Sequence, residues 1–441
     1  MRAGIESPPL DTAGNPSSGP GVRAWIVLGI LCFVYVLNFL DRSLLSILAK
    51  PIEDTLQISD GQLGLISGLY FAMFYCFIAI PLGWIADRTN RVNVLSIACV
   101  IWSAATACCG LAASYAQLVM ARMAVGVGEA GGVPPSYALI TDFFLPGRRG
   151  MALGIYNLGP ALGAAAGIAF GASIAAAFNW RDAFIAIGVI GVVAAVVFKL
   201  IVREPPRGGL DDRSHHAAVS PSFRATVAMF FSRPALVLAA LGSGATQFVT
   251  YGAGNFTTLF LMREKGMTLN LIAVYYALVV GVGMGAGMLI SGRIIDRFTP
   301  RSKAAYATIP AVSLILAMPF YLGFVWAPGW PLALLLLLPP MCLNYFYLSS
   351  AVALVQEEVR PDQRVVSSAL LLLVMNFIGL GLGPTYVGAA SDFLRAQHPG
   401  HSLQIALFSL TPIYLIAILI FFCLARVLRR QERVAAGVNA P

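Results

Sequence analysis

Charged residues are scarce in this 441-residue chain. They make up 11% of the sequence, against about 25% in an average soluble domain. Hydrophobic residues make up 58%. This shortage of charge excludes an ordinary soluble protein. Many apolar runs reach roughly twenty residues or more, long enough to cross a bilayer as helices and too long for barrel strands. The composition therefore predicts an all-α integral membrane protein.

Residues that commonly bind metals or catalyse reactions are also few. All four histidines fall in polar loops. The seven cysteines fall in apolar runs without metal-ligand or disulfide spacing, so we expect them to be packing residues. The sequence GVGEAG (126–131) fits a dinucleotide fingerprint but lies inside an apolar run rather than after a strand. We therefore expect no metal, no cofactor, no enzymatic activity and no direct use of ATP.

The apolar runs predict twelve membrane-spanning helices. Their expected ranges are 23–49, 61–86, 92–113, 116–140, 148–178, 182–202, 233–262, 270–295, 303–326, 330–356, 364–392 and 402–427. The longest polar connection divides them six and six. We predict a disordered tail (1–22), an N-terminal bundle (23–202), a linker (203–232), a C-terminal bundle (233–428) and a second tail (429–441).

Basic residues predict the orientation of these spans. Outside the spans, most Lys and Arg fall on the side that carries both termini and the even-to-odd loops. The other side carries Lys50, Arg181, Arg263, Lys265 and Arg395. Basic loops stay in the cytoplasm, so both termini are predicted to be cytoplasmic in the inner cell membrane. The net charge of +9 needs no nucleic-acid partner. The basic segment 426–433 is expected to anchor the last span, and contact with anionic lipid is an alternative.

Two pairs of loops repeat between the halves. GWIADRTNR (83–91) and GRIIDRFTPR (292–301) share Gly-x-x-x-Asp-Arg, each followed by a further arginine. TDFFLPGRRG (141–150) and QEEVRPDQRV (356–365) share an acid, a proline and then an arginine. Such weak self-similarity between halves is typical of parallel repeats in transporters.

These loops resemble the major facilitator superfamily over residues 23–428. The resemblance implies two six-helix bundles that open alternately to each side of the membrane, with a cytoplasmic gate built from the loops. The gate residues it implies are Asp87, Arg88, Arg91, Asp142, Arg148, Arg149, Asp296 and Arg297. The alternative is that these charges only anchor the helix ends at the interface.

Two further segments narrow the resemblance. NFLDRSLLS (38–46) and RMAVGVGEAGGVPPSYALITDFF (122–144) together look like the Spinster family. That resemblance implies a lysophospholipid or sphingoid-phosphate substrate and coupling to protons. Organic-anion symporters of the same superfamily carry a run similar to NFLDR, so they remain an alternative.

Four charged residues lie deep inside the spans. They are Asp41, Arg42, Arg122 and Glu129. Each costs roughly 2.5–3.5 kcal/mol or more at the bilayer centre, and their formal charges sum to zero. At about 1.5 Å per residue, Asp41 and Arg122 reach similar depths. We predict that these two pair, and that Arg42 bends toward Glu129.

The two carboxylates are the candidates for proton binding. Arginine does not lose its proton in proteins, whereas burial and nearby arginines act in opposite directions on a carboxyl group. Asp41 and Glu129 are therefore predicted to carry protons, and Arg42 and Arg122 to meet an anionic head group. The alternative is a static salt-bridge network that fixes helix packing.

The second half has neutral polar groups instead. The candidates for substrate contact are Gln247, Tyr251, Asn255, Asn344, Tyr345 and Asn376. Taken singly, hydrogen bonding between helices is the more common role of such residues. Taken together, they predict a cavity that is charged on one wall and apolar and aromatic on the other, which suits an amphipathic molecule or lipid.

The sequence thus predicts a monomeric, proton-coupled secondary transporter surrounded by membrane lipid. An organic-anion:proton symporter is the alternative within the same superfamily. An uncoupled channel or lipid scramblase is the alternative from a different class, since it could use the same buried charges.

Overall fold

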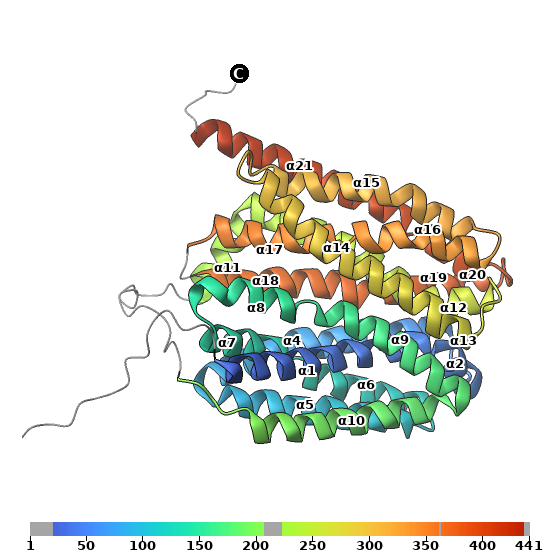
Figure 1. Ribbon diagram of the computed structural model, residues 1–441. Helices are drawn as coiled ribbons and strands as arrows, with labels where there is room; N and C mark the ends of the chain where they lie inside the picture. Colours follow the sequence, from blue (N-terminus) through green and yellow to red (C-terminus); the bar gives the residue numbers. More distant parts are fainter. Residues whose placement is uncertain (1–20, 207–222, 361–362, 436–441) are drawn as a thin grey trace, which may run out of the picture.

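The computed structural model describes residues 21–206, 223–360 and 363–435, and every element in these ranges is a helix (Figure 1). The first half contains α1 (Val22–Ile47), α2 (Ala49–Leu56), α3 (Asp60–Ser67), α4 (Leu69–Arg88), α5 (Arg91–Gly110), α6 (Tyr115–Glu129), α7 (Val133–Phe143), α8 (Pro146–Tyr156), α9 (Gly159–Ala177) and α10 (Trp180–Ile201). The second half contains α11 (Phe223–Ser232), α12 (Pro234–Arg263), α13 (Leu269–Leu271), η2 (Ile272–Tyr276), α14 (Ala277–Phe298), α15 (Ala305–Trp326), α16 (Trp330–Leu343), α17 (Phe346–Glu358), α18 (Arg364–Asn376), η4 (Phe377–Leu382), α19 (Gly383–Arg395), α20 (Ser402–Phe408) and α21 (Thr411–Ala435). The segments η2 and η4 are π-helical.

Eleven helical stretches in the described ranges are long and apolar enough to cross a membrane. The predicted span that is missing from these eleven is the fourth, 116–140, which is interrupted. A turn at residues 130–132 separates α6 from α7, so neither helix alone reaches spanning length. Pro134 and Pro135 follow this turn; each lacks a backbone N–H, and α7 restarts with proline in its first turn. The multi-pass helical membrane fold is confirmed, and the predicted span 116–140 is built from α6 and α7.

The helices of the two halves form two groups (Figure 1). Residues 22–201 fill the lower part of the view and residues 223–435 the upper part. α1 begins and α21 ends on the same side of the molecule, at the left of the view. The exact limits of the two bundles stay a prediction. The predicted linker contains α11, and the proposed tail 1–22 falls almost wholly outside the described residues.

Glycines bring the helices that carry the predicted site into close contact. A Cβ on Gly163 of α9 would lie 2.4 Å from the backbone oxygen of Val36 on α1. A Cβ on Gly128 of α6 would lie 2.5 Å from the backbone nitrogen of Trp102 on α5. Real Cβ atoms do not approach backbone so closely, so these two glycines set the spacing of α1, α5, α6 and α9.

Gly128→Ala is therefore expected to push α6 away from α5. The methyl group would meet Trp102 backbone atoms that cannot move independently of α5, at a cost of about 1–3 kcal/mol. The matched control is Gly154→Ala on α8, where nothing lies within 4 Å of the added Cβ. Thermal unfolding of the purified variants in detergent measures both. Equal unfolding temperatures would contradict the close approach of α5 and α6.

One end of the bundle is closed by charged residues of both halves. These residues, here the Asp60 cluster, are Glu53, Asp60, Arg263, Asp392 and Arg395. The fully buried carboxylate of Asp60 on α3 accepts hydrogen bonds of 2.9 Å from both terminal nitrogens of Arg263 on α12. Arg395 on α19 lies 2.9 Å from the same carboxylate. The cluster therefore ties the first half to the second, at the end opposite the start of α1.

The same end contains a second link between the halves. The helix breaks between α3 and α4 at Gly68, whose backbone angles are not helical. The N–H of Leu69, the first residue after the break, donates to the hydroxyl of Thr385 on α19 over 3.1 Å. Asp392 accepts backbone N–H groups of Asp60 and Gly61 at the start of α3. Backbone donors that the first half leaves open are thus bonded by the second.

Candidate functional site

The four buried charges of the first half come together as two ion pairs. Asp41 Oδ1 on α1 lies 3.7 Å from Arg122 Nη1 on α6. Arg42 Nε donates to Glu129 Oε2 on α6 over 2.5 Å. Both predicted pairings are confirmed: Asp41 with Arg122 from their depth, and Arg42 bending toward Glu129. We call these four residues the charge cluster; it lies where α1 faces the end of α6, just before the turn that interrupts the fourth span.

The members of the charge cluster differ in exposure. The side chains of Asp41 and Arg122 are 2% and 3% exposed, and that of Glu129 is fully buried. Arg42 keeps 13% exposure. A buried charge is tolerated in protein only when it is paired, and the pairing here is internal to the cluster. Arg42 is therefore the most exposed member of the charge cluster.

Aromatic rings surround the two arginines. The guanidinium carbon of Arg42 lies 5.0 Å from the ring centre of Phe39, 5.3 Å from Phe71 and 4.7 Å from Tyr75. The guanidinium carbon of Arg122 lies 5.3 Å from the Phe71 ring. Phe71 is thus shared by both arginines, and cation–π attraction compensates part of their lost hydration. Sequence analysis missed these rings, because in an apolar span nothing distinguishes a Phe beside a charge from one facing lipid.

Tyr251 extends the cluster to the second half. Tyr251, one of the predicted contacts on α12, interacts with the Arg42 side chain. Tyr75 of α4 also interacts with Arg42. Arg42 therefore interacts electrostatically with a tyrosine of each half. A group that binds Arg42 would meet both walls of the interior, which the sequence predicted only in general terms.

The other neutral candidates of the second half mostly bond to neighbouring helices. Gln247 Nε2 donates to Asn376 Oδ1 over 3.0 Å, joining α12 to α18. Asn255 Nδ2 donates to the backbone oxygen of Tyr251, one turn earlier on the same helix. These are the inter-helix and local bonds that are the common role of such residues. The structure therefore does not gather all six candidates at one point.

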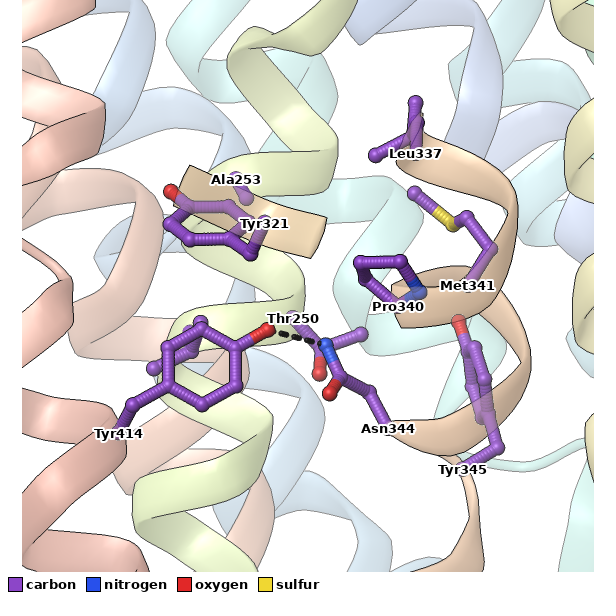
Figure 2. Close-up of a pocket in the computed structure, with 10 residues that line it drawn as sticks. Thr250, Ala253, Tyr321, Leu337, Pro340, Met341, Asn344, Tyr345 and Tyr414 are labelled. Atoms are coloured by element: carbon purple, nitrogen blue, oxygen red, sulfur yellow. Dashed lines mark hydrogen bonds between the residues drawn. The ribbon is translucent and has the colours of Figure 1, made fainter. Parts of the chain in front are cut away.

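Asn344 and Tyr345 line a pocket inside the second half (Figure 2). Asn344 Nδ2 donates to the Tyr414 hydroxyl over 2.6 Å, while its Oδ1 is buried and has no hydrogen-bond partner among the described residues. Thr250, Tyr321 and apolar side chains complete the walls of a small cavity of about 10 Å³, the room that one water molecule needs. The pocket lies between α12, α15, α16 and α21 and is thus separate from the charge cluster.

The predicted cytoplasmic gate residues lie at helix ends. Arg91 forms an ion pair with Asp142, linking α5 to α7. Arg149 Nε donates to the backbone oxygens of Thr141 and Phe144, which closes the turn between α7 and α8. All these contacts are within the first half. Their role as a gate between the halves stays a prediction.

The remaining gate candidates are more exposed. Arg88 packs over the Trp84 ring at 4.0 Å. The exposed candidates are Arg88, Arg148, Asp296 and Arg297. Asp87 falls in the last turn of α4, but its side chain lies outside the described part of the chain. Across the described ranges, no group of three or more His, Cys, Asp or Glu side chains could hold a metal ion.

Comparison with known proteins assigns the family. The family model described as Major Facilitator Superfamily matches residues 31–384. An MFS-type efflux pump of Mycolicibacterium smegmatis is 31% identical over 399 residues, which are 90% of this chain and 91% of that protein. Protein spinster homolog 1 of Rattus norvegicus is 28% identical over 403 residues, covering 85% of this chain and 74% of that protein.

A hexuronate transporter of Bacillus subtilis is 25% identical over 376 residues, covering 83% of this chain and 88% of that protein. Among solved structures, the chain is similar to a bacterial homologue of the human lysosomal transporter Spinster in an inward-facing, unoccupied conformation. The TM-score is 0.85 and the identity 29%, covering 93% of this chain and 99% of that one. The fold and the sequence therefore give the same assignment.

Proposed function

The chain belongs to the Major Facilitator Superfamily and is homologous to Spinster proteins, so it is a secondary transporter and not an enzyme. We propose that it couples transport of an amphipathic anion, a lysophospholipid or sphingoid phosphate, to the movement of protons. The observation that carries this proposal is the charge cluster, two carboxylates and two arginines that neutralise one another inside the bundle. Static packing alone does not require such a costly group, because burying ion pairs seldom adds stability.

The proton sites in this proposal are Asp41 and Glu129. Each carboxylate faces one arginine, and each arginine keeps its charge at any physiological pH. When Arg42 turns toward an anionic head group, Glu129 loses its cation. A buried carboxylate without a cation takes up a proton instead of remaining charged. Binding of the anion and binding of the proton are thereby linked through one arginine.

The interior around Arg42 supports an amphipathic substrate. Its guanidinium offers planar donors that suit phosphate or carboxylate oxygens. The rings of Phe39, Phe71 and Tyr75 stand around it and give an apolar boundary to the same site. A head group would bind Arg42 while an alkyl chain lies against the aromatic and aliphatic side chains of the second half.

We assign the observed conformation to the inward-facing state. We further propose that the protein acts as a monomer in the inner cell membrane, with both termini in the cytoplasm. The Asp60 cluster closes the end that basic residues predict to be outside. The similar Spinster homologue is itself inward-facing. In this assignment the cytoplasmic gate residues engage only when the Asp60 cluster separates.

Proteoliposome uptake with and without a pH gradient tests the proposal. The panel contains a lysophospholipid, a sphingoid phosphate and a small organic anion. Wild-type uptake of one of the lipids should exceed equilibrium only with the gradient and stop with an uncoupler. Asp41→Asn and Glu129→Gln should each lose gradient-driven accumulation. Wild-type pH dependence in both variants would refute proton coupling at these sites.

The hexuronate transporter among the relatives supports a second candidate, an organic-anion:proton symporter. The same arginines would then bind a small carboxylate without an alkyl chain. Accumulation of the organic anion but of neither lipid would favour this candidate. Flux that only equilibrates the substrate, with or without a gradient, would instead indicate an uncoupled channel or scramblase.

A further inference from the structure

Thr106 on α5 faces Asp41 of the charge cluster. Its hydroxyl oxygen lies 2.5 Å from Asp41 Oδ2 and 2.8 Å from the backbone oxygen of Trp102, one turn earlier on α5. Both side chains are buried, with exposures of 1% for Thr106 and 2% for Asp41. Asp41 therefore has a neutral hydrogen-bonding partner in addition to the cation of Arg122.

The Thr106 hydroxyl has two acceptors but one hydrogen. A threonine hydroxyl donates once and can accept as well. Both neighbours, the Asp41 carboxylate and the Trp102 carbonyl, are acceptors while Asp41 is ionised. The hydrogen can serve only one of them, and the bond to a charged acceptor is the stronger. The Trp102 carbonyl is a backbone acceptor one turn away, the partner that a helical threonine ordinarily uses.

We propose that Thr106 is a positioning residue for the proton step, whose hydroxyl rotates each time Asp41 gains or loses a proton. This inference rests on the proposed function, in which Asp41 is a proton site. With Asp41 ionised, Thr106 donates to Oδ2. Once a proton from water has formed an O–H bond on Oδ2, that group donates to Thr106, whose own hydrogen turns to the Trp102 carbonyl.

The rotation leaves this side of Asp41 bonded in both protonation states. Thr106 keeps its own hydrogen throughout, and the proton taken up by Asp41 returns to water. A buried hydroxyl or carboxylate oxygen without a partner is costly. Thr106 lowers that cost in both states, and more in the ionised state, because its bond to the charged carboxylate is the stronger of the two.

Several other groups face Asp41 and must be held constant in any test. They are Arg42 beside it on α1, Arg122 and Glu129 on α6, Cys109 on α5, and Tyr251 of α12 through Arg42. Helix α9, which packs along α1, has no titratable residue, and α10 has them only near its ends, at Arg181, Asp182 and Lys199. Arg122 lies at 3.7 Å, beyond hydrogen-bond distance, so Thr106 is the donor that the described residues give to Asp41.

The pH profile of proton-driven uptake tests the role of Thr106. Thr106→Val keeps the shape of the side chain and removes the hydroxyl, whereas Thr106→Ser keeps the hydroxyl. Loss of a donor to the ionised form makes Asp41 hold its proton to higher pH. The pH of half-maximal uptake should therefore rise by about one unit in Thr106→Val. It should return to the wild-type value in Thr106→Ser, and Thr106→Ala should repeat the shift if the valine variant is unstable.

Each outcome separates this role from the function on which it rests. A purely structural Thr106 would change the amount or thermal stability of the protein without moving the profile, and that result overturns the inference. If Asp41→Asn and Glu129→Gln abolish coupling while Thr106→Val keeps the wild-type profile, proton coupling stands and Thr106 has no part in it. If neither carboxylate variant changes the profile, proton coupling itself fails.

Discussion

Arg122→Gln is expected to give the largest loss of stability of any single change in the charge cluster. It leaves the carboxylate of Asp41, 3.7 Å from the missing cation, buried without its partner on α6. Removing one partner of a buried ion pair costs about 3–5 kcal/mol. The loss should be greatest at mildly alkaline pH and smaller in acid, because an unpaired buried carboxylate takes up a proton. Thermal unfolding of the detergent-solubilised protein across pH measures it.

The double variant Asp41→Asn/Arg122→Gln separates pairing from burial. It replaces both charges by neutral amides, so most of the lost stability should return and its pH dependence should vanish. Uptake should stay absent, since the proton site is gone. Arg224→Gln, at an exposed position on α11, is the control and should unfold like the wild type. A double variant no more stable than Arg122→Gln would contradict the idea that the unpaired charge of Asp41 causes the loss.

Hydropathy predicted the spans well, because the bilayer demands a minimum length of apolar helix. It could not predict where those helices break. The turn at residues 130–132, the break at Gly68 and the π-helical segments η2 and η4 leave the mean hydropathy unchanged. These breaks depend on whether a neighbouring helix can form hydrogen bonds with backbone groups that lose their partner within the helix. The Thr385 hydroxyl, which accepts from the N–H of Leu69, is an example.

The ion pairs of the charge cluster could be predicted because few alternative pairings exist. Only four charges lie deep in the spans, and depth along two helices allows few arrangements. Phe71 and Thr106 could not be found this way, since apolar and hydroxyl side chains are common in membrane helices. Their relevance comes from contacts between α1, α4, α5 and α6 that the order of residues does not encode.

The Asp60 cluster shows a different limit of sequence analysis. Arg263 and Arg395 entered the sequence analysis only as markers of the outer side. Asp60 and Arg263 are separated by 203 positions, and Asp60 and Asp392 by 332. A sequence pattern within one half does not show how far the other half lies from it or how the two halves are oriented. The link between the halves belongs to one conformation, whereas the sequence is the same in every conformation of the protein.

Asp60→Asn is expected to open the end of the bundle that the Asp60 cluster closes. The carboxylate accepts from two nitrogens of Arg263 and from Ser391, and lies 2.9 Å from Arg395. An amide cannot neutralise two arginines, and each hydrogen bond to a charged group contributes about 1.5–3 kcal/mol. The balance between closed and open forms should therefore move at least about tenfold toward the open form.

Spin labels on Asp54→Cys and His398→Cys, in a background without the seven native cysteines, measure this opening. Both positions are exposed, the first on α2 of one half and the second just beyond α19 of the other. Asp60→Asn should add a longer distance to the distribution, and Arg263→Gln should do the same because it removes the other side of the contact. Asp182→Asn changes an exposed carboxylate that does not belong to the cluster and should leave the distances unchanged. Unaltered distances in both cluster variants would show that apolar packing of α3 on α19, rather than charge, keeps this end closed.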